Sequence, residues 1–388
     1  MNKIDFSLKH QTDKPLTEIA PGSELVLWVN NYTPEIGRGK KVVRGTRLAT
    51  HQEEHGGSLC SPCTGKITSV DVGYIRIKVT PPQEGEEAET VEKIDLLTES
   101  TLPEGEELRT ILANLGIDTR PVRKADVLLV NGLNPEPGIM VYGQLYNDCR
   151  EIVEAGLRIA RRVVQPSSCF FAADESSKTF ADCKTIAVKP VYPQGLAPLL
   201  ADKAMGKNFK GSVAVLGLKE LYFIGRVAQT GLPLDHTVIT VNNANYYVPL
   251  GMPVHEVLET AGLEYGKGDR VVLGGPMRGW PIYNLEHGVG RRHCGIFVVK
   301  RDQFPPVVDT PCINCGECVL HCPARLRPNE ITRYAEYDMF EKAEKAGLYS
   351  CLDCGLCAYH CTVNRPLKHY LRFAKRQLLE RAQNASAE

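Results

Sequence analysis

The sequence predicts a multidomain fold that combines α/β and β architecture with a helical, cysteine-rich domain. Three observations support this prediction: β-rich segments with turn glycines between residues 33 and 80, alternating helix and strand signals from about 105 to 225, and eight cysteines in two near-copies after residue 310. The chain has 388 residues, of which 43% are hydrophobic, so it can build two to four domains with ordinary cores.

The first part of the chain is expected to form a small β-barrel or sandwich. Residues 39–52 and 61–79 are rich in β-forming side chains, and glycines interrupt them where tight turns are needed. The segment 81–107 is acidic and carries prolines and glycines, which is typical of a solvated connection. We therefore expect a domain boundary near residue 100.

The middle of the chain indicates an α/β layer structure with at least partly parallel strands. The expected elements are a helix at 106–116 that stops at Gly116, a strand at 125–133, a helix at 145–163, a strand at 184–191 and a helix at 195–206. Ligands in such sheets bind at the carboxyl ends of strands, so the loop 131–138 is a candidate ligand surface. The alternative is that its prolines only shape a turn.

A third segment, 236–282, has the element order of a β-grasp. It contains a strand, a turn, a second strand, a helix over 253–262 and a further strand. Gly274, Gly275 and Gly279 follow, but they lack the spacing and the helix start of a phosphate-binding loop.

The two cysteine runs share the spacing C-x2-C-x2-C-x3-C. The first run holds Cys312, Cys315, Cys318 and Cys322, and the second holds Cys351, Cys354, Cys357 and Cys361. This is the ligand spacing of [4Fe–4S] clusters, and in two-cluster ferredoxins the fourth cysteine of each run binds the other cluster. We therefore expect Cys361 to complete the cluster of the first run, and Cys322 to complete the cluster of the second. The residues between the runs, 326–350, are expected to form two helices.

Zinc and disulfide bonds are the alternatives for so many cysteines. Structural zinc usually takes four ligands from two C-x2-C pairs, whereas each run here already contains four cysteines. A disulfide framework needs an oxidising compartment, but the N-terminal residues contain no apolar signal core. We therefore expect reduced thiols in a cytosol.

Six cysteines lie outside the two runs. Cys60 and Cys63 form a C-x2-C pair, and the nearby His51 and His55 allow a His2Cys2 zinc site as one reading of this segment. The spacing also arises by chance, in which case no metal is bound. The other four are expected to be small buried side chains: Cys149, Cys169, Cys183 and Cys294.

Charge and hydropathy exclude two classes of function. The chain has 46 basic and 46 acidic residues, so no broad positive charge favours nucleic acid. No apolar run approaches the eighteen or so residues of a membrane-spanning helix. The segment 365–383 predicts a basic amphipathic helix, which either docks on a membrane or an acidic partner, or packs on its own domain.

The order of these motifs resembles the C subunit of the Rnf electron-transport complex. The motifs are "GTRLA" with "SPCTGKI", then "VNGLNPEP" with "YPQG", then "GGPMRG", and finally "PCINCGECVLHCP"; the resemblance spans roughly residues 30–375. It implies a barrel-sandwich hybrid (1–100), an α/β domain related to the FMN- and NADH-binding subunit of complex I (101–230), a β-grasp of the soluble-ligand-binding type (231–303), a double [4Fe–4S] ferredoxin domain (304–375) and a tail (376–388).

The chain departs from this family at the flavin site. Family members carry a glycine-rich loop that holds FMN and NADH, whereas residues 111–126 contain one glycine, Gly116. Because such loops need clustered backbone amides without side chains, we predict that the chain binds neither FMN nor NADH tightly, which puts an NADH dehydrogenase activity of its own in doubt.

The resemblance implies a peripheral electron-transfer subunit of an ion-translocating complex. It would lie at the cytoplasmic face of the cell membrane, with integral membrane subunits and a soluble or membrane-bound redox protein as partners, and relay electrons through two [4Fe–4S] clusters. The alternative is a soluble NADH- and FMN-dependent iron–sulfur flavoenzyme, such as a cobalamin reductase. A non-redox, zinc-bound scaffold is a third reading.

Overall fold

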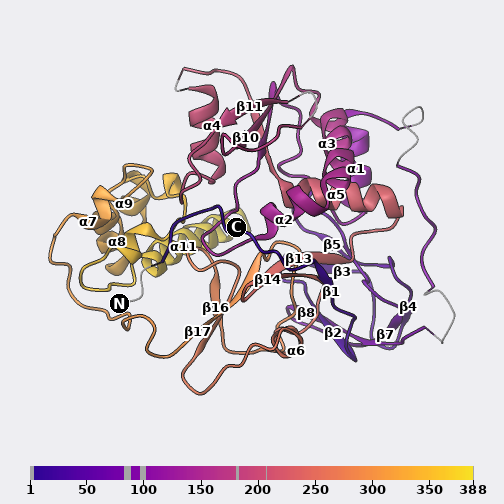
Figure 1. Cartoon of the computed structure of the whole chain (residues 1–388). Helices are drawn as coiled ribbons and strands as arrows, with labels where there is room; N and C mark the ends of the chain where they lie inside the picture. The colour runs from indigo at the N-terminus through magenta and orange to yellow at the C-terminus, as the bar shows by residue number, and fades with distance from the viewer. Residues whose placement is uncertain (1–3, 83–88, 97–101, 181–182, 207, 388) are drawn as a thin grey trace. The chain divides into compact units, whose positions relative to one another are not determined.

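The structure, a computed structural model, describes residues 4–82, 89–96, 102–180, 183–206 and 208–387 (Figure 1). These residues form a mixed α/β protein with several sheets, divided into two compact units. The large unit contains Asp5–Pro276 and Trp280–Val299. The cysteine unit contains Ile4, Met277–Gly279 and the residues from Lys300 onward.

A four-stranded parallel sheet forms the α/β layer of the large unit. Its order is β11 (Lys184–Ala187), β10 (Ser168–Ala173), β9 (Val127–Asn131) and β12 (Val213–Gly217). The accompanying helices are α1 (Gly105–Asn114), α2 (Val141–Asp148), α3 (Arg150–Val164), α4 (Ala197–Met205) and α5 (Leu218–Thr230). All five residues of β9 are buried, as expected for a central parallel strand.

Helices α3 and α5 approach each other closely at a pair of glycines. A Cβ at Gly156 would lie 1.9 Å from the carbonyl oxygen of Leu221, and one at Gly225 would lie 1.9 Å from that of Ile152. Any side chain at either position would therefore force the two helices apart. The single helix predicted over 145–163 is in fact two helices, because the backbone leaves helical geometry at Cys149.

A six-stranded mixed sheet contains the order of strand, strand, helix and strand predicted for residues 236–282. The order is β1 (Thr17–Glu18), β14 (Ala244–Pro249), β13 (His236–Val241), β17 (Gly295–Val299), β15 (Arg270–Leu273) and β16 (Trp280–Ile282), with helix α6 at Val254–Thr260. The N-terminal strand β1 pairs with β14 in this sheet, whereas the sequence grouped residues 1–100 in one domain.

Two antiparallel sheets account for the β-rich start of the chain. One has the order β2 (Glu24–Trp28), β8 (Tyr74–Val79), β7 (Gly65–Asp71) and β4 (Lys41–Val42); the other has β3 (Tyr32–Pro34), β5 (Arg47–His51) and β6 (Leu59–Cys60). Ile75 and Ile77 of β8 are fully buried while their neighbours are not, which is the alternation expected when one face of a strand packs on a core.

The cysteine unit is helical among its described residues. It contains α7 (Glu317–Leu320), α8 (Pro328–Glu336), α9 (Phe340–Lys345), a 3-10 turn (Leu348–Ser350), α10 (Leu356–Tyr359) and α11 (Leu367–Ala387). The two helices predicted between the cysteine runs are α8 and α9. The predicted basic helix is α11, and Leu367, Leu371 and Ala374 on its apolar face are buried in the core of this unit. That face is therefore occupied by the helix's own domain.

Candidate iron–sulfur centre

The two cysteine runs fold as structural repeats. Each cysteine of the second run lies 39 positions after its counterpart, from Cys312 and Cys351 to Cys322 and Cys361, and the short helices α7 and α10 keep the same offset. The left-handed backbone positions repeat as well: Gly316 (φ 85°) matches Gly355 (φ 78°), and Asn314 (φ 55°) matches Asp353 (φ 54°). Glycine, asparagine and aspartate are the residues that adopt this conformation at least cost, so each run can curl tightly around its cysteines.

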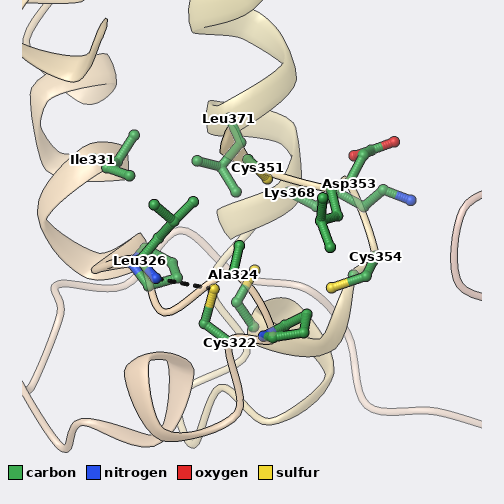
Figure 2. Close-up of a pocket in the computed structure, with 14 residues that line it drawn as sticks. Cys322, Ala324, Leu326, Ile331, Cys351, Asp353, Cys354, Lys368 and Leu371 are labelled. Carbon is green, nitrogen blue, oxygen red and sulfur yellow. Dashed lines mark hydrogen bonds between the residues drawn. The ribbon is translucent and has the colours of Figure 1, made fainter. Parts of the chain in front are cut away.

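Two pockets in the cysteine unit are each lined by four cysteines. One is lined by Cys312, Cys315, Cys318 and Cys361. The other is lined by Cys322, Cys351, Cys354 and Cys357. Figure 2 shows the second pocket, with Cys322, Cys351 and Cys354 around it and a dashed line for the hydrogen bond between Leu326 and Cys322. Each pocket thus combines three cysteines of one run with the fourth cysteine of the other, which are the two quartets expected from the sequence.

Backbone amides point at the sulfur atoms of both fourth cysteines. The amide of Leu326 donates to Cys322 Sγ at 3.4 Å, and the amide of Arg365 donates to Cys361 Sγ at 3.3 Å. The amide of Asn314 donates to Cys312 Sγ at 3.4 Å. Hydrogen bonds of this kind stabilise negative charge on sulfur and raise the reduction potential of a bound cluster.

The cysteines within each quartet shift one another's pKa. Burial, followed by the neighbouring Cys351 and Cys322, raises the pKa of Cys354. Burial raises the pKa of Cys318, and the charges of Cys312, Cys315 and Cys361 add to this effect. By contrast, the hydroxyl of Thr362 and the amide of Glu317 lower the pKa of the exposed Cys315. Buried thiolates so close together need a cation among them, and the iron of a bound cluster would supply that charge.

This donor set has the character of a [4Fe–4S] site. Among the described residues, no three His, Cys, Asp or Glu side chains gather closely enough to hold one metal ion. In a cube each cysteine binds its own iron, so the four sulfur atoms surround a space and do not converge on a point. The four-sulfur lining of each pocket has this character.

A buried arginine distinguishes the first pocket from the second. Arg365 is 3% exposed, lines the first pocket, and its Nη2 lies 2.8 Å from Glu336 Oε2. The equivalent residue 39 positions earlier is Leu326, which lines the second pocket. Near the second pocket, Lys375 donates to the carbonyl oxygen of Cys351 at 2.9 Å. The cysteine spacing gave no indication of these cations, because they follow the runs at positions with no ligand role.

Two histidines join the repeats. His321 and His360 each precede the fourth cysteine of a run, and their rings stack with centroids 3.6 Å apart and planes at 9°. Burial, and then the neighbouring His321, lower the pKa of His360. The fourth cysteines are thus held beside a shared aromatic contact.

The candidate ligand loop 131–138 makes hydrogen bonds to other segments of the large unit. The amide of Asn134 donates to the carbonyl oxygens of Leu8 (3.1 Å) and His10 (3.0 Å), and its Oδ1 accepts from the amide of Tyr142 at 2.9 Å. The amide of Asn131 donates to Gly195 O at 2.9 Å. The N-terminal segment therefore covers polar groups at the carboxyl end of β9.

The segment that stands in place of the flavin loop, residues 111–126, also makes contacts with other residues. Arg291 donates to the carbonyl oxygen of Gly116 at 2.6 Å. The carboxylate of Asp118, which follows closely, binds the guanidinium of Arg120 at 2.6 Å. Near the other glycines, a Cβ at Gly275 would lie 2.1 Å from the carboxylate of Glu136. These contacts occupy the carbonyl oxygen of Gly116 and the space beside Gly275.

The isolated C-x2-C pair is buried in the large unit. Burial raises the pKa of Cys60 to about 12 and that of Cys63 to about 11. His51 Nδ1 accepts from the amide of Glu53 at 3.0 Å, and His55 Nε2 lies 2.8 Å from Glu106. Because both histidines already make these contacts, the described residues give no support to a zinc site at Cys60 and Cys63.

Two other cysteines differ from expectation. The sequence indicated that Cys169 and Cys183 were separate buried thiols, but the structure pairs them as a disulfide with a Cα–Cα distance of 4.7 Å. The parallel pairing of β10 and β11 brings them together, since Phe170 lies opposite Lys184. A pairing across two strands has no signature in local spacing.

Comparison with known proteins finds a family for the segment of the cysteine runs and relatives that match over half of the chain. The 4Fe-4S dicluster domain family matches residues 306–362. The C subunit of the ion-translocating oxidoreductase complex of Rhodobacter capsulatus is 28% identical over 246 residues, covering 57% of this chain and 47% of the relative. The corresponding C subunits of Pasteurella multocida (27% identity, 58% of this chain, 30% of the relative) and Salmonella enteritidis (26%, 57% and 35%) are similar.

The chain is similar to these C subunits over more than half of its length. The sequence-based recognition of this relationship, and of an iron–sulfur dicluster domain, is confirmed. The chain spans less than half the length of these three relatives.

Solved structures give only distant similarity. Crystal structures of NAD+-reducing [NiFe]-hydrogenase in the H2-reduced and air-oxidized states match with TM-scores of 0.41 and 0.40 and identities of 13% and 14%. They cover 63% and 66% of this chain, and 56% and 54% of theirs. Among the helices of the described residues, none combines the length and the apolar character needed to span a membrane.

Proposed function

We propose that the chain is a peripheral electron-transfer subunit of an Rnf-type, membrane-bound, ion-translocating oxidoreductase complex. It relays single electrons through two [4Fe–4S] clusters, between a redox protein and the integral membrane subunits, at the cytoplasmic face of the membrane. The similarity to C subunits of ion-translocating oxidoreductase complexes supports the complex, and the dicluster match supports the cofactor type.

The pair of four-cysteine pockets carries this proposal. Cluster 1 would be held by Cys312, Cys315, Cys318 and Cys361, and cluster 2 by Cys351, Cys354, Cys357 and Cys322. Because each quartet borrows one ligand from the other run, the two clusters must be near neighbours. Burial raises the pKa of Cys357, and the charges of the other cysteines in its quartet raise it further. Cys318 of the other quartet also contributes to this rise, which supports that proximity.

The protein's own groups have defined roles in this relay. When bound, the clusters supply reversible one-electron oxidation and reduction. The amides of Leu326 and Arg365 stabilise charge on Cys322 and Cys361, and Arg365 places a buried cation beside cluster 1. The core residues Ile331, Leu348 and Leu371 are 0–4% exposed and exclude water from the interior of the unit. These groups set the potentials while the backbone stays rigid.

The proposal includes no tight binding of FMN or NADH. It is supported by the single glycine in residues 111–126, by the engaged carbonyl of Gly116, and by the N-terminal cover over Asn134. Electrons would then enter and leave through the clusters by way of other proteins.

Iron and sulfide analysis of anaerobically purified protein tests the proposal. Two full quartets should bind about eight irons and about eight sulfides, with the broad visible absorption of iron–sulfur clusters. A stoichiometry near four would leave one quartet without a cluster. Zinc in place of iron, with no visible absorption, would overturn the redox function altogether.

A further inference from the structure

The two repeats of the cysteine unit differ in what covers their outer surface. A Cβ at Gly355, in the second run, would lie 2.7 Å from the carbonyl oxygen of Met277. A Cβ at the equivalent Gly316 would meet no atom of the described residues within 4 Å. Both glycines have the same left-handed backbone, so the difference lies in their surroundings.

The chain itself covers the second run. Lys368 on α11 donates to the carbonyl oxygen of Met277, and Arg372 one turn later donates to that of Arg278 at 2.8 Å. On the neighbouring helix α10, the hydroxyl of Tyr359 accepts from the amide of Ile4 at 3.1 Å. A loop of polypeptide, held through its carbonyl groups, thus seals the surface beside Cys354, which is buried.

The matching surface of the first run is bare and apolar. Ile313, Val319 and Leu320 are 59%, 36% and 77% exposed. Their counterparts 39 positions later are Leu352, Ala358 and Tyr359, and all three are half-buried. Cys315 is exposed, although its counterpart Cys354 is buried. Residues 313–320 thus hold three exposed apolar side chains and one exposed cluster ligand, and exposed apolar side chains gathered in one short segment mark interaction sites.

We propose that Ile313, Cys315, Gly316, Val319 and Leu320, here called the Gly316 face, dock a protein that carries a one-electron redox centre. This inference rests on the proposed function, which places cluster 1 behind this face. The occupant is polypeptide because a polypeptide loop fills the matching position in the second repeat. It carries a redox centre because the exposed Cys315, as a ligand of cluster 1, would bring electron exchange to this face.

The small size of the face indicates the kind of complex. Redox proteins form weak, short-lived encounters that bury less surface than stable dimers. Three exposed apolar side chains match such an encounter, in which one or two central residues carry most of the affinity. Leu320, the most exposed of the three, is the best candidate for that role.

Electron-exchange kinetics test the proposal with the full-length, cluster-loaded chain. The protein donor is a reduced two-[4Fe–4S] ferredoxin, and reduced methyl viologen is the small donor that needs no docking face. Leu320→Gln is compared with Leu379→Gln, a control on α11 whose leucine is 57% exposed in the same unit. Neither change adds charge, so steering is unaltered.

Leu320→Gln should lower the second-order rate with ferredoxin about tenfold, the loss expected at an interface hot spot. The viologen rate should stay within twofold, and Leu379→Gln should alter neither rate by more than twofold. Equal ferredoxin rates for both variants, or no exchange between the unaltered chain and ferredoxin, would overturn the proposal.

Iron counts and electron paramagnetic resonance spectra separate this failure from failure of the proposed function. If Leu320→Gln keeps two clusters and its kinetics are unchanged, the docking face alone is refuted. If the unaltered chain itself binds no clusters, the relay is refuted. If Leu320→Gln loses iron, Ile313→Gln is measured against the same control. Sedimentation that shows a dimer abolished by Leu320→Gln would identify a second copy as the occupant and reject the redox partner.

Discussion

Replacing Arg365 with leucine gives the first half of the cysteine unit the residue that already stands at position 326 in the second pocket. The change removes a side chain that is 2% exposed and takes a 2.8 Å ion pair from Glu336. It also removes the guanidinium contact with the ring of Tyr370, at 5.7 Å. We expect a less stable unit that holds cluster 1 less firmly.

The magnitude follows from how much of the ion pair is buried. Removing one partner of a buried pair costs about 3–5 kcal/mol when the other charge cannot reach water. The side chain of Glu336 is 31% exposed, so its carboxylate regains part of its hydration. We therefore expect Arg365→Leu to cost about 2 kcal/mol, which corresponds to roughly 30-fold in an equilibrium or rate.

The assay is the anaerobic rate of cluster loss in guanidinium chloride, followed by visible absorption, because unfolding of a cluster protein is irreversible. Arg365→Leu should lose its clusters at least tenfold faster, and Arg365→Leu with Glu336→Leu should recover much of the difference because an apolar pair replaces an ionic one. Arg376→Leu is the control, since Arg376 is 77% exposed in its pair with Glu380. Rates for Arg365→Leu within twofold of the unaltered chain would refute this reasoning.

Three further predictions concern ligation, flavin and pH. Cys361→Ser should damage cluster 1 and Cys322→Ser cluster 2, as resolved by electron paramagnetic resonance; damage confined to the cluster of the mutated run would reject the shared ligation. Fluorescence titration should find no micromolar FMN affinity, and later addition of NADH should not reduce the clusters; rapid reduction would restore the flavoenzyme reading. Burial, and next the neighbouring His287, hold the pKa of His293 at about 3, so the unfolded state, with its ordinary pKa near 6.5, binds the proton first. Stability of the large unit should therefore fall as pH drops below about 6.5, by about 2 kcal/mol from this residue between pH 7 and 5, and His293→Gln should flatten the denaturant midpoints over that range.

The cysteine quartets could be predicted because their determinants are local. Spacing within a run fixes which three sulfur atoms can surround one cube, and the same code applies to the second run. The left-handed glycines Gly316 and Gly355 lie inside the same short motifs. The arrangement of Cys322 and Cys361 in the two pockets follows the general pattern of two-cluster ferredoxins, with no further information needed.

Features that depend on distant segments could not be predicted. Nothing near Arg365 in the sequence signals that α8 supplies Glu336 as its partner, so its burial is a tertiary property. The strand β10 is a short apolar run whose type is ambiguous until β9 and β11 flank it. Helix α5 could have been predicted, because the apolar residues over 218–230 recur at helical spacing.

The N-terminal cover of the α/β layer has a consequence for synthesis on the ribosome. Leu8 donates its amide to Pro190 O, Tyr192 donates to Phe6 O, and β1 pairs with β14. Phe6 and Leu8 therefore find their partners only after about 180 further residues have been translated, and β1 finds β14 only after about 230 further residues. Until then the carboxyl end of β9 lacks its cover, and contacts so far apart in sequence form slowly. We expect nascent chains halted before β14 to be far more sensitive to protease than the released protein, and to rely on chaperones for longer than their length alone would suggest.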